Sequence, residues 1–515
     1  MRIIKYLALA LTLSLSVSSC RDALEIVQDG ELTEDVVFSN PKNMEKYLNG
    51  AVYGSLDNTA QIKFTSVFTD ELRIGPSSVG GDFDLFRYII TPNNGYASSI
   101  WAGRYTTIKR VNTLLEGATK ISPTTPEEAL TYNNTLAEAR AIRAYAYLDL
   151  ISYFSPNPKD NNAIGVMLTT SPAKVGDVLP RVNNGEIWAV VESDLNYAYD
   201  NINTAYQNAD GVLHKAPFFI SKATVNAIRA RMYLYRGNYP LAMQYAEAAI
   251  TDSGLSLSQA LPIPNGAVGS AAWNTQFYAV AGGPSPYRKM WADAVANTDE
   301  SIFKLSRPAV GSGGIAGIYT TNSTQMSGAP QWTTGLNLFG ALTSTPNDIR
   351  RYAFIDPSSE NNFYVIDKYP GKGNTPLKND IKIFRISEMY LILAECAAQT
   401  NLALAATYIK QIRDARVYAG SADLPVYGSK TEALRDILKE RRVELAFEGH
   451  RYLDLKRIGQ EAGVSIDRNS DDDWIAPSTP LTLSITDYRF TLPIPASEIN
   501  GNPAIKDQQN PGYTF

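Results

Sequence analysis

The sequence predicts a mainly α-helical chain, in which helix pairs form a superhelical scaffold that carries a large, irregular, loop-rich region. Two observations favour this fold class: apolar residues recur with helical spacing in both outer parts of the chain, and the middle is rich in Gly and Pro. A chain of 515 residues is longer than one core normally supports, so an extended array of stacked helices is expected.

Composition excludes several classes of function. The net charge is −5 and no basic run is present, so nucleic acid is not expected as a partner. Two His and two Cys are too few for the usual His/Cys metal site, and we therefore predict no metal and no cofactor. Tyr is abundant, with 30 residues, and its apolar ring with a polar tip suits amphipathic ligands.

The first 19 residues have the order of a secretory signal peptide. Arg2 and Lys5 are followed by an apolar run over 6–17, which is too short to span a bilayer comfortably, and then by two serines. Residues 17–20, Val-Ser-Ser-Cys, resemble a bacterial lipobox, in which cleavage leaves the Cys as an acylated first residue. We therefore expect residues 1–19 to be removed and the mature chain to be tethered through palmitate-type chains on Cys20.

The N-terminal part, residues 20–250, is expected to be helical. Asn40 followed by Pro41 has the sequence of a capping residue and a first helical position. Small residues such as Ala223 and Ala227 lie on one helical stripe and allow close helix contact, as in tetratricopeptide-like units. Helices are expected over residues 41–56, 101–115, 136–154, 186–202, 220–236 and 239–250.

The middle part, residues 251–380, is expected to be irregular. It holds 14 Gly and 10 Pro in 130 residues, a higher density than the 35 Gly and 28 Pro of the whole chain. Its aromatic residues either contact ligand or fill a small loop-rich core. The C-terminal part, residues 381–515, returns to helices, with Cys396 as a small buried hydrophobe. The helices expected there cover residues 381–400, 402–416, 431–449 and 452–458.

Several segments, in order, resemble the SusD/RagB family of outer-membrane nutrient-binding lipoproteins. They are EARAIRAYAYLDLISYF (138–154), YLYRGNY (233–239), ISEMYLILAE (386–395), ERRVELAFEGHRYLDLKRIG (440–459), LPIPASEIN (492–500) and QNPGY (509–513). The resemblance runs from Cys20 to Tyr513 and is weakest between residues 251 and 380. It implies that residues 20–515 form one SusD-like unit.

The resemblance also implies a function. Family members are non-catalytic lipoproteins on the extracellular face of the outer membrane, in nutrient uptake of the Bacteroidetes type. They capture oligosaccharides and deliver them to a TonB-dependent, SusC-like β-barrel transporter. Some members bind peptides instead, and this alternative stays open here, as does a subunit that only gates the barrel.

Two loop clusters are the expected ligand contacts. The first follows the opening helices, where the family places one wall of its ligand site. The second lies where sugar-binding members carry stacking aromatics. Pyranose C–H faces pack on aromatic rings, while polar side chains bind the hydroxyls. The expected contacts are Asp70, Arg73, Asp82, Phe83 and Phe86 in the first cluster, and Tyr319, Gln331 and Trp332 in the second.

Glu440, Glu444 and Glu448 recur every four residues on one helical face. Carboxylates at this spacing lie about 5–6 Å apart at Cβ, close to the separation in a retaining glycosidase. A surface glycosidase that uses Glu444 and Glu448 is therefore the enzymatic alternative. We favour a helix locked by ion pairs with arginines of the same motif, and expect no catalytic residue. The acidic run 471–473 lacks the spacing of a calcium loop and is expected to be a solvated turn.

Overall fold

The computed structural model describes residues 34–174, 176–203, 206–207, 211, 213–214, 216–279, 282–294, 299–307, 314–319, 330–372, 375 and 378–514. The expected signal peptide and Cys20 lie outside these residues. Within this part of the chain, no helix combines the length and the apolar character needed to cross a membrane.

The N-terminal half is helical, as predicted. Asn40 caps the helix that begins at Pro41, because its side chain accepts the backbone N–H of Asn43. The helices are α3 (Glu34–Val37), α4 (Pro41–Tyr47), the π-helical η1 (Leu48–Val52), α5 (Tyr53–Ser55), α6 (Thr59–Phe68), α7 (Phe83–Phe86), α8 (Gly95–Ala118), α9 (Pro126–Phe154), α10 (Asn184–Asn201), α11 (Lys222–Tyr235) and α12 (Tyr239–Ser253).

The C-terminal half contains short helices in the loop-rich region and long helices after it. Of the predicted helices, the one expected over 402–416 is found with those bounds. The elements are α13 (Ala271–Phe277), α14 (Pro286–Trp291), the 3₁₀ helix η2 (Ile315–Ile318), α15 (Leu336–Thr343), α16 (Arg350–Phe354), α17 (Ile386–Ala397), α18 (Leu402–Arg416), α19 (Lys430–Glu444), α20 (Arg451–Ala462), η4 (Tyr488–Phe490), α21 (Ala496–Gly501) and η5 (Pro503–Ile505).

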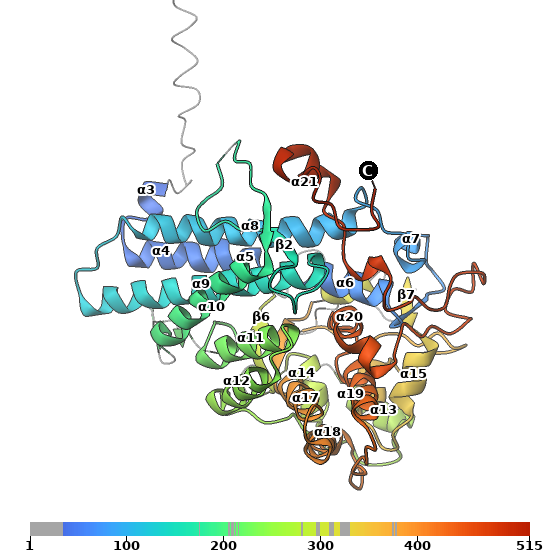
Figure 1. Cartoon of the computed structure of the whole chain (residues 1–515). Coiled ribbons are helices and arrows are strands. Elements are labelled where there is room, and N and C mark those ends of the chain that lie inside the picture. The colour runs from blue at the N-terminus through green and yellow to red at the C-terminus, as the bar shows by residue number, and fades with distance from the viewer. Residues whose placement is uncertain are drawn as a thin grey trace, which may run out of the picture.

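The long helices form an array in which each helix packs against the next. Contacts run from α8 through α9, α10, α11 and α12 to α17, and on through α18 and α19 to α20 (Figure 1). Because α12 packs directly against α17, the loop-rich region is an insertion between two neighbouring helix pairs. Small residues make the close contact possible, as Ala242, Ala246 and Ala249 of α12 are buried.

The described residues form four small antiparallel sheets, of which the β1–β7 and β6–β8 pairs join segments far apart in the sequence. They pair β1 (Leu72–Ile74) with β7 (Trp332–Thr334), β2 (Ile164–Met167) with β3 (Arg181–Asn183), β4 (Tyr206–Gln207) with β5 (Leu213–His214), and β6 (Ser301–Leu305) with β8 (Ile381–Arg385). The start of the helix expected over 381–400 is strand β8 instead. Its partner β6 lies far away in the sequence, so local periodicity could not reveal this strand.

The helix expected over 431–449 ends early. α19 stops at Glu444, and Phe447 and Gly449 then adopt positive φ values of 65° and 87° before α20 begins at Arg451. Such values turn the chain out of a right-handed helix. The motif therefore forms two helices joined by a tight turn. Cys396 lies in the core at 4% exposure, as predicted, and burial raises the pKa of its thiol.

Candidate functional site

The two predicted loop clusters meet at the β1–β7 strand pair. Ile74 of β1 lies opposite Trp332 of β7, and the backbone N–H of Gly75 donates to the carbonyl of Gln331 over 2.8 Å. Some 260 residues of chain separate the two strands. Residues predicted independently from sequence are thus brought into one region, at the side of the molecule where α7, β7 and α15 lie (Figure 1).

Three of the predicted aromatic contacts are buried, and the expectation of open stacking faces is wrong for them. Trp332 is 1% exposed and packs on Phe86 with ring centroids 5.3 Å apart. Tyr319 packs edge-on against Phe447, and its hydroxyl lies 3.3 Å from the Ser66 hydroxyl. Trp332 lies on strand β7, Phe86 on α7 and Tyr319 directly after η2, and all three rings are buried beneath the surface.

Asp70 is also a structural residue. Its carboxylate accepts two hydrogen bonds from the Arg451 guanidinium, at 2.9 and 2.8 Å. Burial alone would raise the pKa of Asp70, but Arg442 and Arg451 outweigh burial and hold it well below the usual range. A buried, paired carboxylate is not available to ligand hydroxyls, so the expected ligand role of Asp70 is not supported.

Arg73 is largely buried, but its guanidinium contacts loop residues beside the β1–β7 strand pair. Its guanidinium lies 4.1 Å from the ring centroid of Phe363, and its Nε donates to the carbonyl of Asp471 over 3.1 Å. The side chain therefore fixes the ring of Phe363 by a cation–π contact.

The other predicted contacts, Phe83, Asp82 and Gln331, are partly exposed and stay predictions. Asp82 forms an ion pair with Lys63 at 2.8 Å. The guanidinium of Arg87 lies 4.9 Å from the Phe83 ring centroid. This ring and its flanking charges lie on the short helix α7, beside the loop of residues 75–82.

Sequence reasoning missed Trp474, an indole that is 45% exposed. Its Nε1–H donates to the carbonyl of Ile74 over 3.0 Å, and its ring meets Phe363 edge-on with centroids 6.3 Å apart. The hydrogen bond fixes the indole next to β1 while much of the ring stays in solvent. The only available signal was a tryptophan directly after a polar turn, and such a residue is as often packed as exposed.

The acidic run before Trp474 is not a fully solvated turn. Asp472 is buried and accepts backbone N–H groups from Leu336 and Asn469, at 3.0 and 2.9 Å. Burial raises the pKa of Asp472 to about 6. Asp473 forms an ion pair with Arg87 at 2.9 Å. The run therefore ties the tryptophan loop to α7 and α15, and only Asp471 is exposed.

We call this set of side chains the Trp474 surface; it comprises Arg73, Phe83, Arg87, Phe363 and Trp474. It combines partly exposed rings with guanidinium groups that are already oriented by other contacts. Rings of this kind pack against the apolar faces of a sugar or a peptide side chain, and the polar rim offers hydrogen bonds. Residues 320–329, which precede β7, lie outside the described residues.

Glu444 and Glu448 do not form a glycosidase pair. Glu444 is bound by Arg350, Arg385 and Arg416 at 2.9–3.1 Å, and Glu448 by Lys368 and Arg385, each at 2.7 Å. Burial would raise their pKa values, but these cations hold both below the usual range. A general acid needs a raised pKa and access to substrate, and neither carboxylate has them.

The ion network of the motif is thus confirmed, but its partners differ from those predicted. The cations at Glu440, Glu444 and Glu448 come from other elements, β8, α16, α18 and the loop at Lys368. The motif's own arginines instead bind acids elsewhere: Arg441 binds Asp454, Arg442 and Arg451 bind Asp70, and Arg457 binds Glu395 and Asp454.

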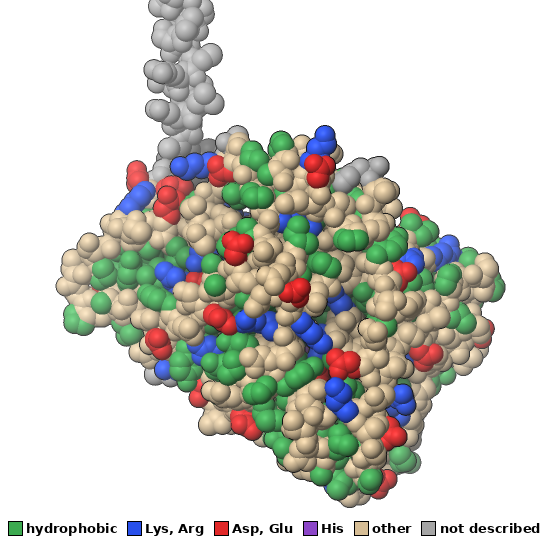
Figure 2. Space-filling model, in the orientation of Figure 1, with side chains coloured by type: hydrophobic (Ala, Val, Ile, Leu, Met, Phe, Trp, Pro, Cys, Tyr) green, Lys and Arg blue, Asp and Glu red, His purple; other side chains and the backbone are tan. Residues whose placement is uncertain are grey.

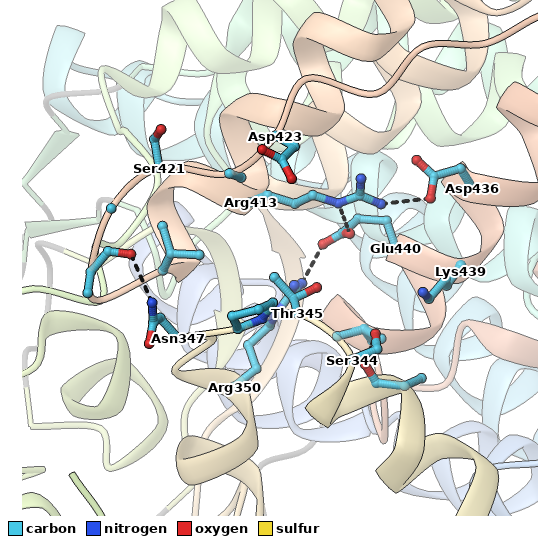
Figure 3. A pocket seen from close by; sticks show the side chains of 17 residues that line it. Ser344, Thr345, Asn347, Arg350, Arg413, Ser421, Asp423, Asp436, Lys439 and Glu440 are labelled. Carbon is cyan, nitrogen blue, oxygen red and sulfur yellow. Dashed lines mark hydrogen bonds and ion pairs between the residues drawn. The ribbon is translucent and has the colours of Figure 1, made fainter.

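A polar pocket of about 430 Å³ lies between α15, α18, α19 and the loop after α18 (Figure 3). Arg413 points into it but already binds Asp436 at 2.8 Å and Glu440 at 2.7 Å. No aromatic side chain lines it. Its charges are compensated within the protein, so it offers less for a sugar ring than the Trp474 surface does.

The face of the molecule in Figure 2 shows no large patch of one charge. Acidic, basic and hydrophobic side chains are interspersed over the face shown in Figure 2. In the described part of the chain, no group of three His, Cys, Asp or Glu side chains is placed to hold a metal ion.

Comparisons with known proteins agree with the fold. The SusD family model matches residues 348–513. SusD-like protein P2 of Formosa agariphila is 23% identical over 99% of this chain and 100% of its own length. Two solved structures superpose on most of the chain: a SusD superfamily protein from Bacteroides thetaiotaomicron (TM-score 0.70, 23% identity, 92% of this chain and 100% of that one) and surface glycan-binding protein A from Bacteroides uniformis (TM-score 0.65, 20% identity, 91% and 98%).

The helix-pair array, the family-model match and the full-length relatives agree with one another and with the sequence motifs. Over residues 348–513 the chain is similar to the SusD family, and over its full length it is similar to SusD-like proteins.

Proposed function

We propose that this protein is a non-catalytic, cell-surface lipoprotein that binds oligosaccharides and delivers them to a TonB-dependent β-barrel transporter in the outer membrane. Similarity to the SusD family supports a binding role, and one structural relative is a surface glycan-binding protein. The lipobox-like residues 17–20 support attachment to the membrane.

The observation that carries the sugar-binding proposal is the Trp474 surface. An exposed indole held in place by a backbone hydrogen bond loses little conformational freedom when a ligand packs on it. The Phe363 ring and the Arg73 guanidinium extend the same surface. Phe83, Asp82 and Gln331 complete the proposed contact set, with Trp332 and Phe86 beneath it.

Isothermal titration with a panel of oligosaccharides tests the proposal. We expect at least one glycan to bind and Trp474→Ala to weaken it about fivefold or more, because stacking of a ring on an aromatic side chain contributes about 1–3 kcal/mol in nucleic-acid complexes. Tyr408→Ala is the matched control, since this tyrosine lies on α18 and contacts only Tyr390 among the rings. Binding that survives Trp474→Ala unchanged would contradict the site.

The same titration distinguishes the peptide alternative. Binding of short peptides, with no binding of any glycan in the panel, would assign the surface to peptide capture instead. Release of new reducing ends from a glycan by the purified protein would contradict a non-catalytic role.

A further inference from the structure

A second aromatic cleft, with a volume of about 170 Å³, lies in the loop-rich region. We call it the Arg351 cleft; its main lining residues are Asn274, Tyr278, Phe339, Arg351, Tyr352 and Tyr364. The volume is well below the roughly 300 Å³ at the lower end of typical small-molecule sites. It therefore suits one ring-sized unit of a longer ligand.

The walls of the cleft are held by packing and hydrogen bonds. Phe339 and Tyr364 stack face to face, with ring planes 7° apart. Tyr352 packs edge-on against Trp273, with centroids 5.2 Å apart, and the Tyr278 hydroxyl donates to the Tyr352 carbonyl over 2.9 Å. An aromatic wall that is already ordered costs little further entropy when a ring docks on it.

Arg351 differs from the other arginines of the loop-rich region. Arg288 binds Asp367, Arg307 binds Asp57 and Arg350 binds Asp348. Arg351 is exposed, and no carboxylate of the described residues lies within ion-pair distance of its guanidinium.

The Arg351 guanidinium lies over aromatic rings of the cleft instead, 4.8 Å from the centroid of Tyr352 and 5.8 Å from that of Phe339. The nearest lining acid, Asp356, already accepts the backbone N–H of Ser358 over 2.8 Å. The cleft therefore presents an oriented cation with its hydrogen-bond donors unused by protein carboxylates.

We propose that the Arg351 cleft binds an anionic sugar unit, one that carries a carboxylate or a sulfate ester. The sugar ring packs on the aromatic wall, and the guanidinium binds the anionic group through two parallel N–H···O bonds. This proposal rests on the proposed glycan-binding function and specifies the class of glycan.

The cleft and the Trp474 surface share one chain segment. Phe363 contacts Trp474, whereas the next residue, Tyr364, stacks on Phe339 in the cleft. The Tyr364 carbonyl also accepts the backbone N–H of Thr334 in β7 over 2.8 Å. The two places are therefore connected through the backbone of residues 363 and 364.

The test is isothermal titration of the full-length mature chain with charge-matched pairs of oligosaccharides. The pairs are oligogalacturonate with its full methyl ester and keratan sulfate oligosaccharide with its desulfated form, and the second member of each pair is neutral. We expect the anionic member of at least one pair to bind at least tenfold more tightly than its neutral counterpart. This preference should shrink as ionic strength rises, because salt screens exposed charges.

Arg351→Gln should weaken the anionic ligand about tenfold or more and leave the neutral one within twofold, since hydrogen bonds to charged groups contribute more than neutral ones. Arg435→Gln is the matched control, because Arg435 is exposed on α19 and donates only to the Ala462 carbonyl. Equal binding of both members of each pair, or anionic binding unchanged in Arg351→Gln, overturns the proposal.

The outcomes distinguish failure of the anionic-sugar proposal from failure of the glycan-binding proposal. In one outcome, a neutral glycan binds, Trp474→Ala weakens its binding, and Arg351→Gln alters no binding. This result supports glycan binding and contradicts the proposal of an anionic site in the Arg351 cleft. If no glycan of either kind binds, both proposals fall.

Discussion

Asp70 and Glu71 are neighbours in the sequence and both are buried, yet their carboxyl groups differ in charge. Asp70 is held ionised by Arg442 and Arg451. Glu71 accepts a hydrogen bond from the Ser66 hydroxyl at 2.7 Å and from the Phe447 N–H at 3.2 Å. Burial dominates at Glu71 and raises its pKa to about 7. Below neutral pH the Asp70 carboxylate is therefore ionised while the Glu71 carboxyl is protonated.

The raised pKa of Glu71 predicts a pH-dependent stability. Between the unfolded-state pKa of about 4.5 and the folded pKa of about 7, the folded chain holds a proton that the unfolded chain releases. The contribution of Glu71 to the free energy of unfolding therefore falls as pH rises, by about 1.4 kcal/mol per pH unit within that window. Glu71→Gln, which cannot ionise, should lose this component.

Urea unfolding of the wild type and Glu71→Gln at pH 5, 6 and 7 measures the difference. We expect the free energy of unfolding of the wild type to fall relative to the variant as pH rises. Glu360→Gln, an exposed carboxylate, serves as the control and should track the wild type. Curves for Glu71→Gln and the wild type that run parallel over this range would contradict the assignment.

At the scale of elements, periodic helices followed from the sequence and short strands did not. The helix of α18 was predicted with the observed bounds, because helical periodicity is a local signal, and in the structure the Asn401 side chain caps it by accepting the Leu404 N–H. Strands β1 and β7 have three residues each and pair across most of the chain. Such pairing is decided by the partner strand, which no local window contains.

Gly75, which follows β1, is the point at which this pairing is most sensitive to substitution. A Cβ at Gly75 would lie within 2.7 Å of the Gln331 carbonyl oxygen, too close for backbone that cannot move. We expect Gly75→Ala to separate β1 from β7 locally and to weaken glycan binding at least tenfold. The far-UV circular dichroism should change little, since β1 and β7 have three residues each and the signal is dominated by the helices.

Gly103→Ala on α8 is the control, because a Cβ there meets nothing within 4 Å. It should keep wild-type binding and gain slightly in stability, as Ala favours helix more than Gly does. Glycan affinity that is equal in Gly75→Ala and the wild type would show that the β1–β7 pair does not organise the binding surface.

At the scale of the whole molecule, the helix array carries the loop-rich region as an insertion whose two ends lie close together. Because α12 and α17 are in contact, the loop-rich region leaves and rejoins the scaffold at one place. The described chain begins with α3 and ends near α21, and both lie on the upper side of the molecule in Figure 1. The proposed anchor at Cys20 precedes α3 by a short segment that lies outside the described residues.

The lipid anchor is tested with the whole protein in a Gram-negative outer membrane. We expect an alkyne-labelled palmitate to be incorporated into the wild type and the protein to sediment with membranes. Cys20→Ser should lose both properties, because the thiol is the acceptor of the lipid. Cys396→Ser should keep both, since that thiol is buried in α17. Label that persists in Cys20→Ser would refute anchoring at this residue.

The sequence by itself determined the helical scaffold and the resemblance to the SusD/RagB family, because local periodicity and contiguous motifs encode them. Only the tertiary structure decided which side chains face solvent. It buried Trp332, Tyr319 and Phe86, paired Asp70 with Arg451, and left Trp474 exposed. In irregular segments the direction of a side chain depends on strands and loops that arrive from elsewhere in the chain, and a residue's type does not specify them.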